Sequence, residues 1–157
     1  MRRTLFLSAG LGALALLAHP AIRISDARAP AAVTGTAGTV DSERYSDARL
    51  AELRAQGRIV FVNFTADWCI TCKVNEKVVF GNAEVRRVLA EKNVAWLTAD
   101  WTTPDPAITE ALARFGRSGV PLYLLYPPEG EPEILPQILT PDIMIQAINW
   151  VASLERK

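Results

Sequence analysis

Apolar residues change their spacing along the chain in a regular order, and this order predicts the elements of an α/β domain. Residues 58–65 are β-branched and aromatic and almost continuously apolar, as expected of a central strand covered on both faces. Residues 94–99 and 121–126 predict two further strands. Residues 133–139 follow a Pro-Pro-Glu-Gly turn and predict an antiparallel partner, in which Pro136 favours the sheet edge.

Stretches with helical spacing separate the expected strands. We expect a serine-capped helix at residues 46–56, another helix at residues 107–115 and a last helix that begins at Pro141. A longer helical stretch covers residues 69–92, with a kink or break predicted at Gly81-Asn82. This succession of strands and helices is typical of an α/β fold in which helices cover a mixed sheet.

The first 26 residues predict a targeting segment. Arg2 and Arg3 precede an apolar run from Leu5 to Ala18, which is typical of a signal-peptide core and shorter than the roughly 20 residues that span a bilayer. Extending the run to Ile24 gives a marginal span, so residues 1–26 are either a cleaved signal peptide or an uncleaved signal-anchor. We favour the anchor, with the two arginines in the cytoplasm and the folded part outside it.

A flexible linker is expected next, at residues 27–45, because most of this stretch is rich in alanine, glycine, proline and threonine and lacks apolar periodicity. The remaining residues, 46–157, form the expected folded domain. Half of the 157 residues are apolar, which is enough for one domain with a hydrophobic core.

The charge and the cysteine count exclude several classes of function. The chain has 17 basic and 17 acidic residues, scattered along it, so we expect no nucleic-acid partner. Its two cysteines, Cys69 and Cys72, are too few for a framework of structural disulfides and supply half the thiolates of a four-cysteine zinc site. The one histidine, His19, lies far away in the N-terminal segment. Redox chemistry therefore fits better than a metal site.

Cys69 and Cys72 follow an expected strand and open an expected helix. An unperturbed cysteine, with a pKa of about 8.5, is only about 3 per cent thiolate at neutral pH. A helix N-terminus lowers this pKa, because its unpaired N–H groups and dipole favour negative charge. The spacing brings both sulfurs within bonding reach, the first exposed and the second turned inward. We therefore expect Cys69 to attack and Cys72 to resolve, with no cofactor beyond this disulfide.

The motifs around the cysteines resemble the thioredoxin superfamily. Residues 61–73 contain the CxxC motif, and Gly119-Val120-Pro121 precedes a strand. Within the superfamily, the chain resembles the C-terminal periplasmic domain of the membrane reductase DsbD, including its copper-tolerance-linked ScsB-type relatives. That closer resemblance is carried by Asp67-Trp68-Cys69, Lys73, Glu76, residues 99–102 and residues 115–126. It implies a thioredoxin-like α/β fold over roughly residues 46–153, with a central mixed sheet flanked by helices and the CxxC at a helix N-terminus.

The resemblance also implies partners and a location. Electrons would arrive from a membrane electron-donor domain of the DsbD type and leave toward periplasmic disulfide-bearing proteins. The domain is expected to be monomeric and to lie on the periplasmic face, anchored to the inner membrane by the N-terminal segment.

Two site residues follow from the resemblance alone. Pro121 would be a cis-proline facing the CxxC, leaving the Val120 backbone free to pair with an extended substrate strand; the alternative is an ordinary trans-proline that opens a strand. Glu76 matches an acidic residue on the helix after the CxxC, and it either handles protons or is a solvated helix residue.

A second acidic position of the family falls on Asn63, which cannot ionise, so proton handling shifts to Glu76 or water. Trp68 is expected to form an apolar wall of the substrate groove, or else to belong to the core. Asp67 is assigned to the same groove. Together with Lys73 it tunes the local charge, unless both are ordinary surface residues.

Three functions remain open at this stage. The first is a protein-disulfide reductase, favoured because Ile70-Thr71 lacks the histidine of strongly oxidising CxxC pairs; its potential should lie toward thioredoxin's, about −270 mV, and away from DsbA's, about −120 mV. The second is a thioredoxin-like reductase of cytochrome c maturation. The third is a copper-tolerance protein whose two thiolates bind Cu(I), although neither methionine lies near the CxxC.

Overall fold

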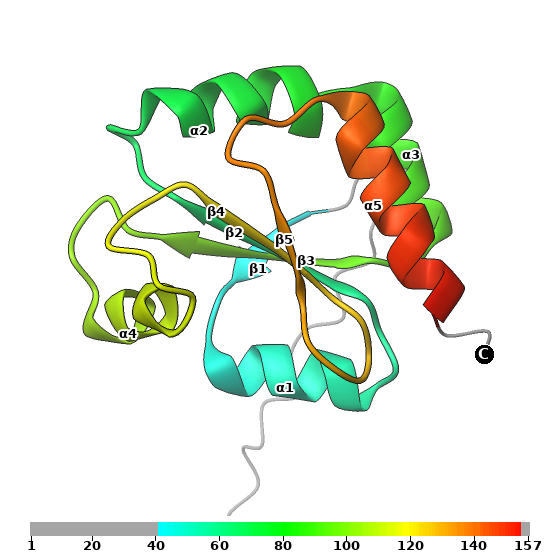
Figure 1. Ribbon diagram of the computed structural model, residues 1–157, viewed down its shortest axis with the longest axis horizontal. Helices are drawn as coiled ribbons and strands as arrows, with labels where there is room; N and C mark the ends of the chain where they lie inside the picture. Colours follow the sequence, from blue (N-terminus) through cyan, green and yellow to red (C-terminus); the bar gives the residue numbers. More distant parts are fainter. Residues whose placement is uncertain (1–40, 155–157) are drawn as a thin grey trace, which may run out of the picture. The chain divides into compact units, whose positions relative to one another are not determined.

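The computed structural model describes residues 41–154, in which helices cover both faces of a five-stranded sheet (Figure 1). The strands are β1 (Glu43–Arg44), β2 (Val60–Thr65), β3 (Ala95–Asp100), β4 (Leu122–Tyr126) and β5 (Glu133–Leu135). The helices are α1 (Asp47–Ala55), α2 (Ile70–Asn75), the π-helix η1 (Glu76–Phe80), α3 (Ala83–Glu91), α4 (Pro106–Arg114) and α5 (Pro141–Leu154).

The sheet is mixed, and its strand order is β1-β3-β2-β4-β5. β1, β3 and β2 run parallel, whereas β4 pairs antiparallel with both β2 and β5. In the central register, Asn63 of β2 lies between Thr98 of β3 and Tyr123 of β4. This mixed sheet, with the CxxC at the start of a helix, confirms the predicted thioredoxin-like fold class.

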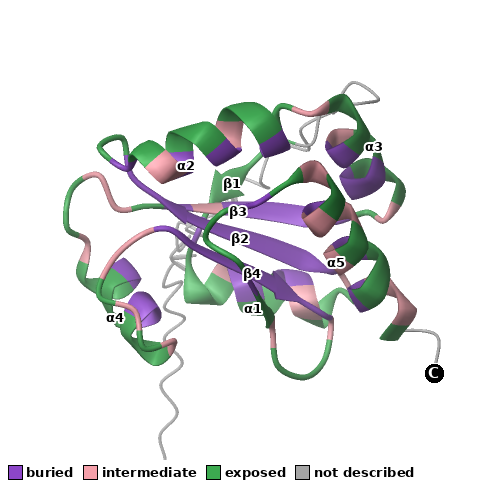
Figure 2. Ribbon diagram, turned by 45° about the horizontal axis from the view of Figure 1, so that its top comes forward, coloured by how far each residue is buried: buried purple, intermediate pink, exposed green. Residues whose placement is uncertain are grey.

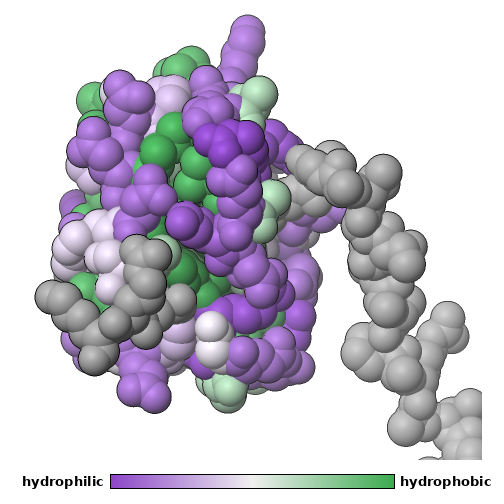
Figure 3. Space-filling view, turned by 90° about the vertical axis from the view of Figure 1, so that its right-hand side faces the viewer, coloured by the Kyte–Doolittle hydropathy of each residue, from purple (hydrophilic) through white to green (hydrophobic). Residues whose placement is uncertain are grey.

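β2 is the centre of the core and is buried along its whole length (Figure 2). Its side chains alternate between the two faces of the sheet. Phe61 joins a cluster with η1, α3 and α5, whereas Val62 and Phe64 join a cluster with α1 and α4. Because both faces are covered, the strand has no polar face, which explains its nearly continuous apolar sequence. On the side of α3 and α5, the outer surface is mostly hydrophilic (Figure 3).

The sheet begins earlier than the sequence pattern predicts. β1 lies within residues 27–45, the range expected to be a linker, and the Tyr45 N–H that follows it donates to Thr98 O at 2.9 Å. A two-residue edge strand is too short to show any periodicity. Residues 27–40 of that range and the targeting segment expected at 1–26 lie outside the described residues. Within the described part, no helix has the length and apolar character needed to cross a membrane.

The helix that follows the CxxC contains a π turn. Its predicted break at Gly81-Asn82 is present, and the Asn82 side chain caps α3. The sequence pattern does not predict η1, in which the Gly81 N–H donates to Glu76 O, five residues back, at 2.9 Å. A Cβ at Gly81 would lie 2.8 Å from Lys77 O, so glycine suits this close backbone approach. The turn places the adjacent residues Val79 and Phe80 in the core.

β5 is also shorter than predicted, because it ends at Leu135 and does not continue to residue 139. Pro136 follows directly, and proline has no N–H to donate to a strand ladder. The segment between β5 and α5 then passes close to α2, where Gln137 O and the Leu139 N–H form hydrogen bonds with Asn75.

Candidate active site

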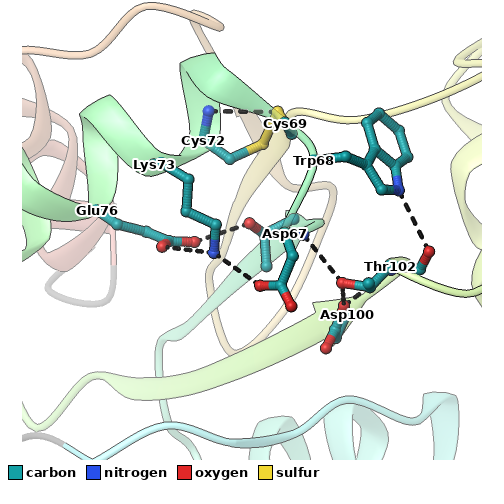
Figure 4. A network of polar contacts seen from close by, with 9 residues as sticks. Asp67, Trp68, Cys69, Cys72, Lys73, Glu76, Asp100 and Thr102 are labelled. Carbon is teal, nitrogen blue, oxygen red and sulfur yellow. Dashed lines mark hydrogen bonds and ion pairs between the residues drawn. A yellow bond between two sulfur atoms is a disulfide. The ribbon is translucent and has the colours of Figure 1, made fainter.

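Cys69 and Cys72 form a disulfide at the start of α2, with Cα atoms 5.3 Å apart (Figure 4). Cys69 is the N-cap residue of α2, and its Sγ accepts a hydrogen bond from the Cys72 N–H at 3.2 Å. Cys69 keeps 7% of its surface exposed, whereas Cys72 keeps 0%. Cys69 therefore keeps a small exposed surface at the start of α2, and Cys72 keeps none.

The chain turns sharply between β2 and α2 to place the disulfide there. The Cys69 N–H donates to Ala66 O at 3.1 Å, and the Trp101 N–H holds the end of β2 by donating to Thr65 O at 2.8 Å. The Cys69 sulfur consequently sits where the first helical N–H groups point. When the disulfide is reduced, these groups favour a negative charge on that sulfur.

The loop before β4 lies against the disulfide. The peptide bond between Val120 and Pro121 is cis, the geometry that the family resemblance implies. Val120 is half-buried and packs against the small cluster formed by Ala66, Cys69 and Cys72. Val120 therefore lies beside the Cys69–Cys72 disulfide.

A lysine bridges two acidic groups beside the disulfide (Figure 4). Lys73 Nζ lies 3.2 Å from Asp67 Oδ1 and 3.0 Å from Glu76 Oε2. The Thr65 hydroxyl donates to the other oxygen of Glu76 at 2.8 Å. The hydrogen bonds that Lys73 donates, first to Glu76 and then to Asp67, raise the pKa of Lys73. Lys73 is thus a positive charge held in place within one helical turn of Cys72.

Thr102 joins the loop before the disulfide to the end of β3. Its hydroxyl accepts from the Asp67 N–H at 2.9 Å, and its backbone oxygen accepts from Trp68 Nε1–H at 3.2 Å. The Thr102 N–H and hydroxyl both donate to Asp100 Oδ1, which lowers the pKa of Asp100. Sequence reasoning assigned Thr102 no role, although it lies in a segment, residues 99–102, that carries the family resemblance.

Exposed apolar side chains precede Cys69 and continue along α2. Trp68 is 57% exposed although its indole nitrogen is hydrogen-bonded, and its ring centroid lies 6.0 Å from that of Trp101. Ile70 and Val74 are also exposed, at 81% and 54%. Trp68 is therefore not a core residue, and it is held in a fixed position at the surface beside Cys69.

Two buried asparagines lie on the sheet side of α2. Asn75 donates from Nδ2 to the Tyr123 hydroxyl at 2.9 Å and to Gln137 O at 2.8 Å, and its Oδ1 accepts from the Leu139 N–H at 3.3 Å. Asn63 is 3% exposed, and its Oδ1 has no hydrogen-bond partner among the described residues. Sequence reasoning missed Asn75, because its partners lie far away in the chain.

Residues 41–154 contain no group of three or more histidine, cysteine, aspartate or glutamate side chains placed to hold a metal ion. The redox group of the site is its own pair of sulfurs.

Comparison with known proteins places the chain in a family. The Thioredoxin-like family model matches residues 41–128. The chain is 38% identical over 92 residues to the thiol:disulfide interchange protein DsbD of Pseudomonas fluorescens, a match that covers 59% of this chain and 15% of that protein. It is 37% identical over 83 residues to DsbD of Vibrio cholerae, covering 53% of this chain and 14% of that one. The matched segment is thus a small part of these relatives.

Solved structures share the fold. The oxidised C-terminal domain of DsbD from Neisseria meningitidis aligns with a TM-score of 0.54 at 22% identity, covering 71% of this chain and 98% of that one. A thioredoxin from Thermus thermophilus aligns with a TM-score of 0.58 at 21% identity, covering 72% and 88%.

The fold and the disulfide at the start of α2 define a thioredoxin-like domain whose redox group is its own pair of cysteines. The chain belongs to the thioredoxin-like family, and the predicted resemblance to DsbD proteins is confirmed.

Proposed function

We propose that this protein is an extracytoplasmic protein-disulfide reductase. It passes electrons by dithiol–disulfide exchange from a membrane donor of the DsbD type to periplasmic disulfide-bearing proteins. The observation that carries the proposal is the unequal pair of sulfurs, Cys69 partly exposed at the helix start and Cys72 fully buried behind it, in a chain similar to DsbD proteins.

The exchange proceeds in two steps. In the reduced protein, the Cys69 thiolate attacks one sulfur of the partner's disulfide, forming a mixed disulfide and releasing the partner's other sulfur as a thiolate. Cys72 then loses its proton and attacks the Cys69 sulfur, which releases the second partner sulfur. Two electrons pass to the partner, and the Cys69–Cys72 disulfide forms. Because Cys72 is fully buried, its reaction is with Cys69 and not with outside proteins.

The loop at Val120 and the indole of Trp68 bind the partner in this proposal. An extended segment of the partner pairs with the backbone at Val120, beside the cis bond to Pro121, as in β-strand addition. Trp68 is the opposite apolar wall. Its tether to Thr102 keeps it in place before the partner arrives.

Glu76 handles the proton of the exchange. Its carboxylate lies one helical turn after Cys72, held by Thr65 and Lys73. Asp67 acts through Lys73, whose positive charge it shares with Glu76. Since Asn63 cannot ionise, Glu76 is the titratable group that the proposal assigns to this step.

Location and assembly rest on the similarity to DsbD proteins and on the expected N-terminal segment. We place the domain on the periplasmic face, anchored to the inner membrane by residues 1–26, and acting as a monomer.

Equilibration of the full chain with glutathione redox buffers tests the direction of electron flow. A reductase should have a potential closer to thioredoxin's, about −270 mV, than to DsbA's, about −120 mV. It should also reduce the disulfides of insulin with a dithiol as donor, and Cys69→Ser should abolish this activity. A potential near DsbA's, or a Cys69→Ser variant that still reduces insulin, would overturn the proposal.

A further inference from the structure

A line of aliphatic side chains along the helix after the disulfide is uncovered. Ile70, Val74 and Val78 follow one another at four-residue intervals, so they share one face of α2 and η1, and each keeps more than half of its surface exposed. We call these three residues the aliphatic stripe. The other exposed residues of α2 and η1 are Lys73 and Lys77. The exposed positions that the structure describes on this helix, green in Figure 2, are thus aliphatic or basic, and none is acidic.

The segment between β5 and α5 adds to this surface. Gln137 O and the Leu139 N–H both form hydrogen bonds with Asn75, so the intervening Ile138 is held beside α2 (Figure 1). Ile138 is nevertheless 75% exposed. It is therefore a fourth exposed aliphatic side chain at the same helix.

The aliphatic stripe begins at the disulfide. Cys69 is the N-cap residue of α2, and the strongly exposed Ile70 directly follows it. The stripe then runs along α2 and η1 to Val78, about two helical turns further on. Whatever covers the stripe therefore lies next to Cys69.

The side chains of this face suit a lipid surface. Helices that lie in a membrane interface insert apolar side chains among the headgroups and carry lysines beside them, because a lysine reaches the headgroups while its stem stays with the apolar residues. Lys73 is paired with Asp67 and Glu76. Within residues 41–154 Lys77 has no such ion pair, so its charge can meet an anionic headgroup.

The expected N-terminal anchor would keep the domain near such a surface. Fully extended, the expected linker up to residue 40 is at most about 50 Å long. A domain of this size has a radius of gyration of about 13 Å, so this linker would let any face of the domain meet the bilayer. The tether would therefore hold the membrane close, and the side chains of each face decide which one rests on it.

We propose that the aliphatic stripe and Ile138 dock the domain on the periplasmic leaflet of the inner membrane. The four aliphatic side chains enter the headgroup region, and Lys77 pairs with an anionic lipid. Cys69 then lies at the membrane surface, where a donor held in the membrane can exchange with it. The inference deepens the proposed function and rests on its anchor at residues 1–26.

Spin-label accessibility in vesicles tests the docking. The full chain with Cys69→Ser and Cys72→Ser carries one nitroxide, at Val74→Cys or, as the control, at Glu110→Cys, an exposed position of α4 on the other side of the sheet (Figure 1). The same N-terminal segment tethers both proteins to vesicles of phosphatidylcholine and phosphatidylglycerol. The ratio of collision rates with oxygen and with a water-soluble nickel complex should be several-fold higher for the label at position 74. Equal ratios at the two positions would overturn the inference.

Added carboxylates test whether the stripe itself holds the domain. Ile70→Asp with Val78→Asp should lower the ratio at position 74 to that at position 110, because a charged group opposes insertion. Ala107→Asp with Ala113→Asp, at exposed positions of α4, makes the same change in net charge and should leave the ratio as it is. An equal fall in both variants would show that net charge, and not the stripe, brings the domain to the lipid, which contradicts the inference.

Flotation of the vesicles separates this inference from the proposed function. A chain that floats with the vesicles while its label at position 74 stays in water is anchored but not docked by this face, and that result refutes the docking alone. A chain that does not float refutes the anchor and the docking together. Reduction of insulin by the wild type needs no vesicles, so its loss would instead refute the reductase function.

Discussion

Thr102 connects two segments that meet at the disulfide, the loop that carries Asp67 and Trp68 and the end of β3. It does so with both its hydroxyl and its backbone oxygen, while Asp100 fixes the orientation of the hydroxyl. Trp68 keeps more than half of its surface exposed, so burial does not fix its position; its hydrogen bond to Thr102 does. This hydrogen bond holds Trp68, the proposed wall of the substrate groove, in place before a partner binds. It therefore reduces the conformational entropy lost on binding.

Thr102→Val keeps the backbone oxygen that binds Trp68 but removes the hydroxyl that accepts from the Asp67 N–H and donates to Asp100. It should therefore loosen the loop that carries Trp68, weaken binding of protein partners and leave the chemistry of the disulfide intact. We expect the KM for insulin to rise about three- to tenfold, the effect of one or two lost hydrogen bonds. The rate of reduction by dithiothreitol, which needs no groove, should not change. Steady-state kinetics and stopped-flow tryptophan fluorescence measure the two quantities.

The exposed neighbour Thr103→Val is the control for Thr102→Val, and it should affect neither quantity. If Thr102→Val slows reduction by dithiothreitol as much as it impairs insulin reduction, Thr102 acts on the disulfide itself and not through Trp68.

Sequence reasoning identified the residues whose chemistry is local. Cys69 and Cys72 can be recognised by their spacing after a predicted strand, and Trp68 directly precedes Cys69. Thr102 and Asn75 could not be found in this way, because their partners are up to 64 residues away in the chain and are brought near only by the fold. The unpaired state of Asn63 Oδ1 is likewise a property of the packed structure.

Among the elements, α2 with η1 is attached to the sheet by hydrogen bonds of Asn75 as well as by the bond from Thr65 to Glu76. The buried Asn75 side chain donates two hydrogen bonds and accepts a third, and these join the helix to β4 and to the segment between β5 and α5. That segment contains no regular structure until Pro141, so these bonds help to fix its path.

Asn75→Ala should lower the free energy of unfolding of the oxidised protein by about 2–4 kcal/mol, because it leaves two buried groups, the Tyr123 hydroxyl and the Leu139 N–H, without this partner and also removes the bond to Gln137 O. Urea denaturation measures this change. Asn149→Ala, at an exposed position of α5, is the control and should alter stability by less than about 0.5 kcal/mol. Equal midpoints for the two variants would show that Asn75 does not anchor the helix.

The elements themselves were largely predictable, since their periodicity and end signals are strong. The serine cap of α1, the buried β2 and the break at Gly81-Asn82 follow from local sequence. β1 and η1 did not, for different reasons. β1 is two residues long, and the π turn depends on how the helix packs against Phe61 and Trp96 as well as on its own residues.

For the whole molecule, the succession of strands and helices predicted an α/β fold with a mixed sheet, and the family resemblance supplied the cis bond. The strand order β1-β3-β2-β4-β5 is a long-range property that the apolar pattern alone does not specify. The fold places the start of α2, the Val120 loop and the end of β3 at one site, and the exchange chemistry of Cys69 depends on all three.

The central claim is that Cys69 is the reactive sulfur and Cys72 the protected one. Alkylation of the reduced full chain with iodoacetamide, across a range of pH and with each modified cysteine identified by mass spectrometry, tests it directly. Cys69 should react first, with a midpoint pH below the ordinary cysteine value of about 8.5, while Cys72 stays unmodified in the folded protein. Equal modification of both cysteines, or a Cys69 midpoint at the ordinary value, would contradict the account.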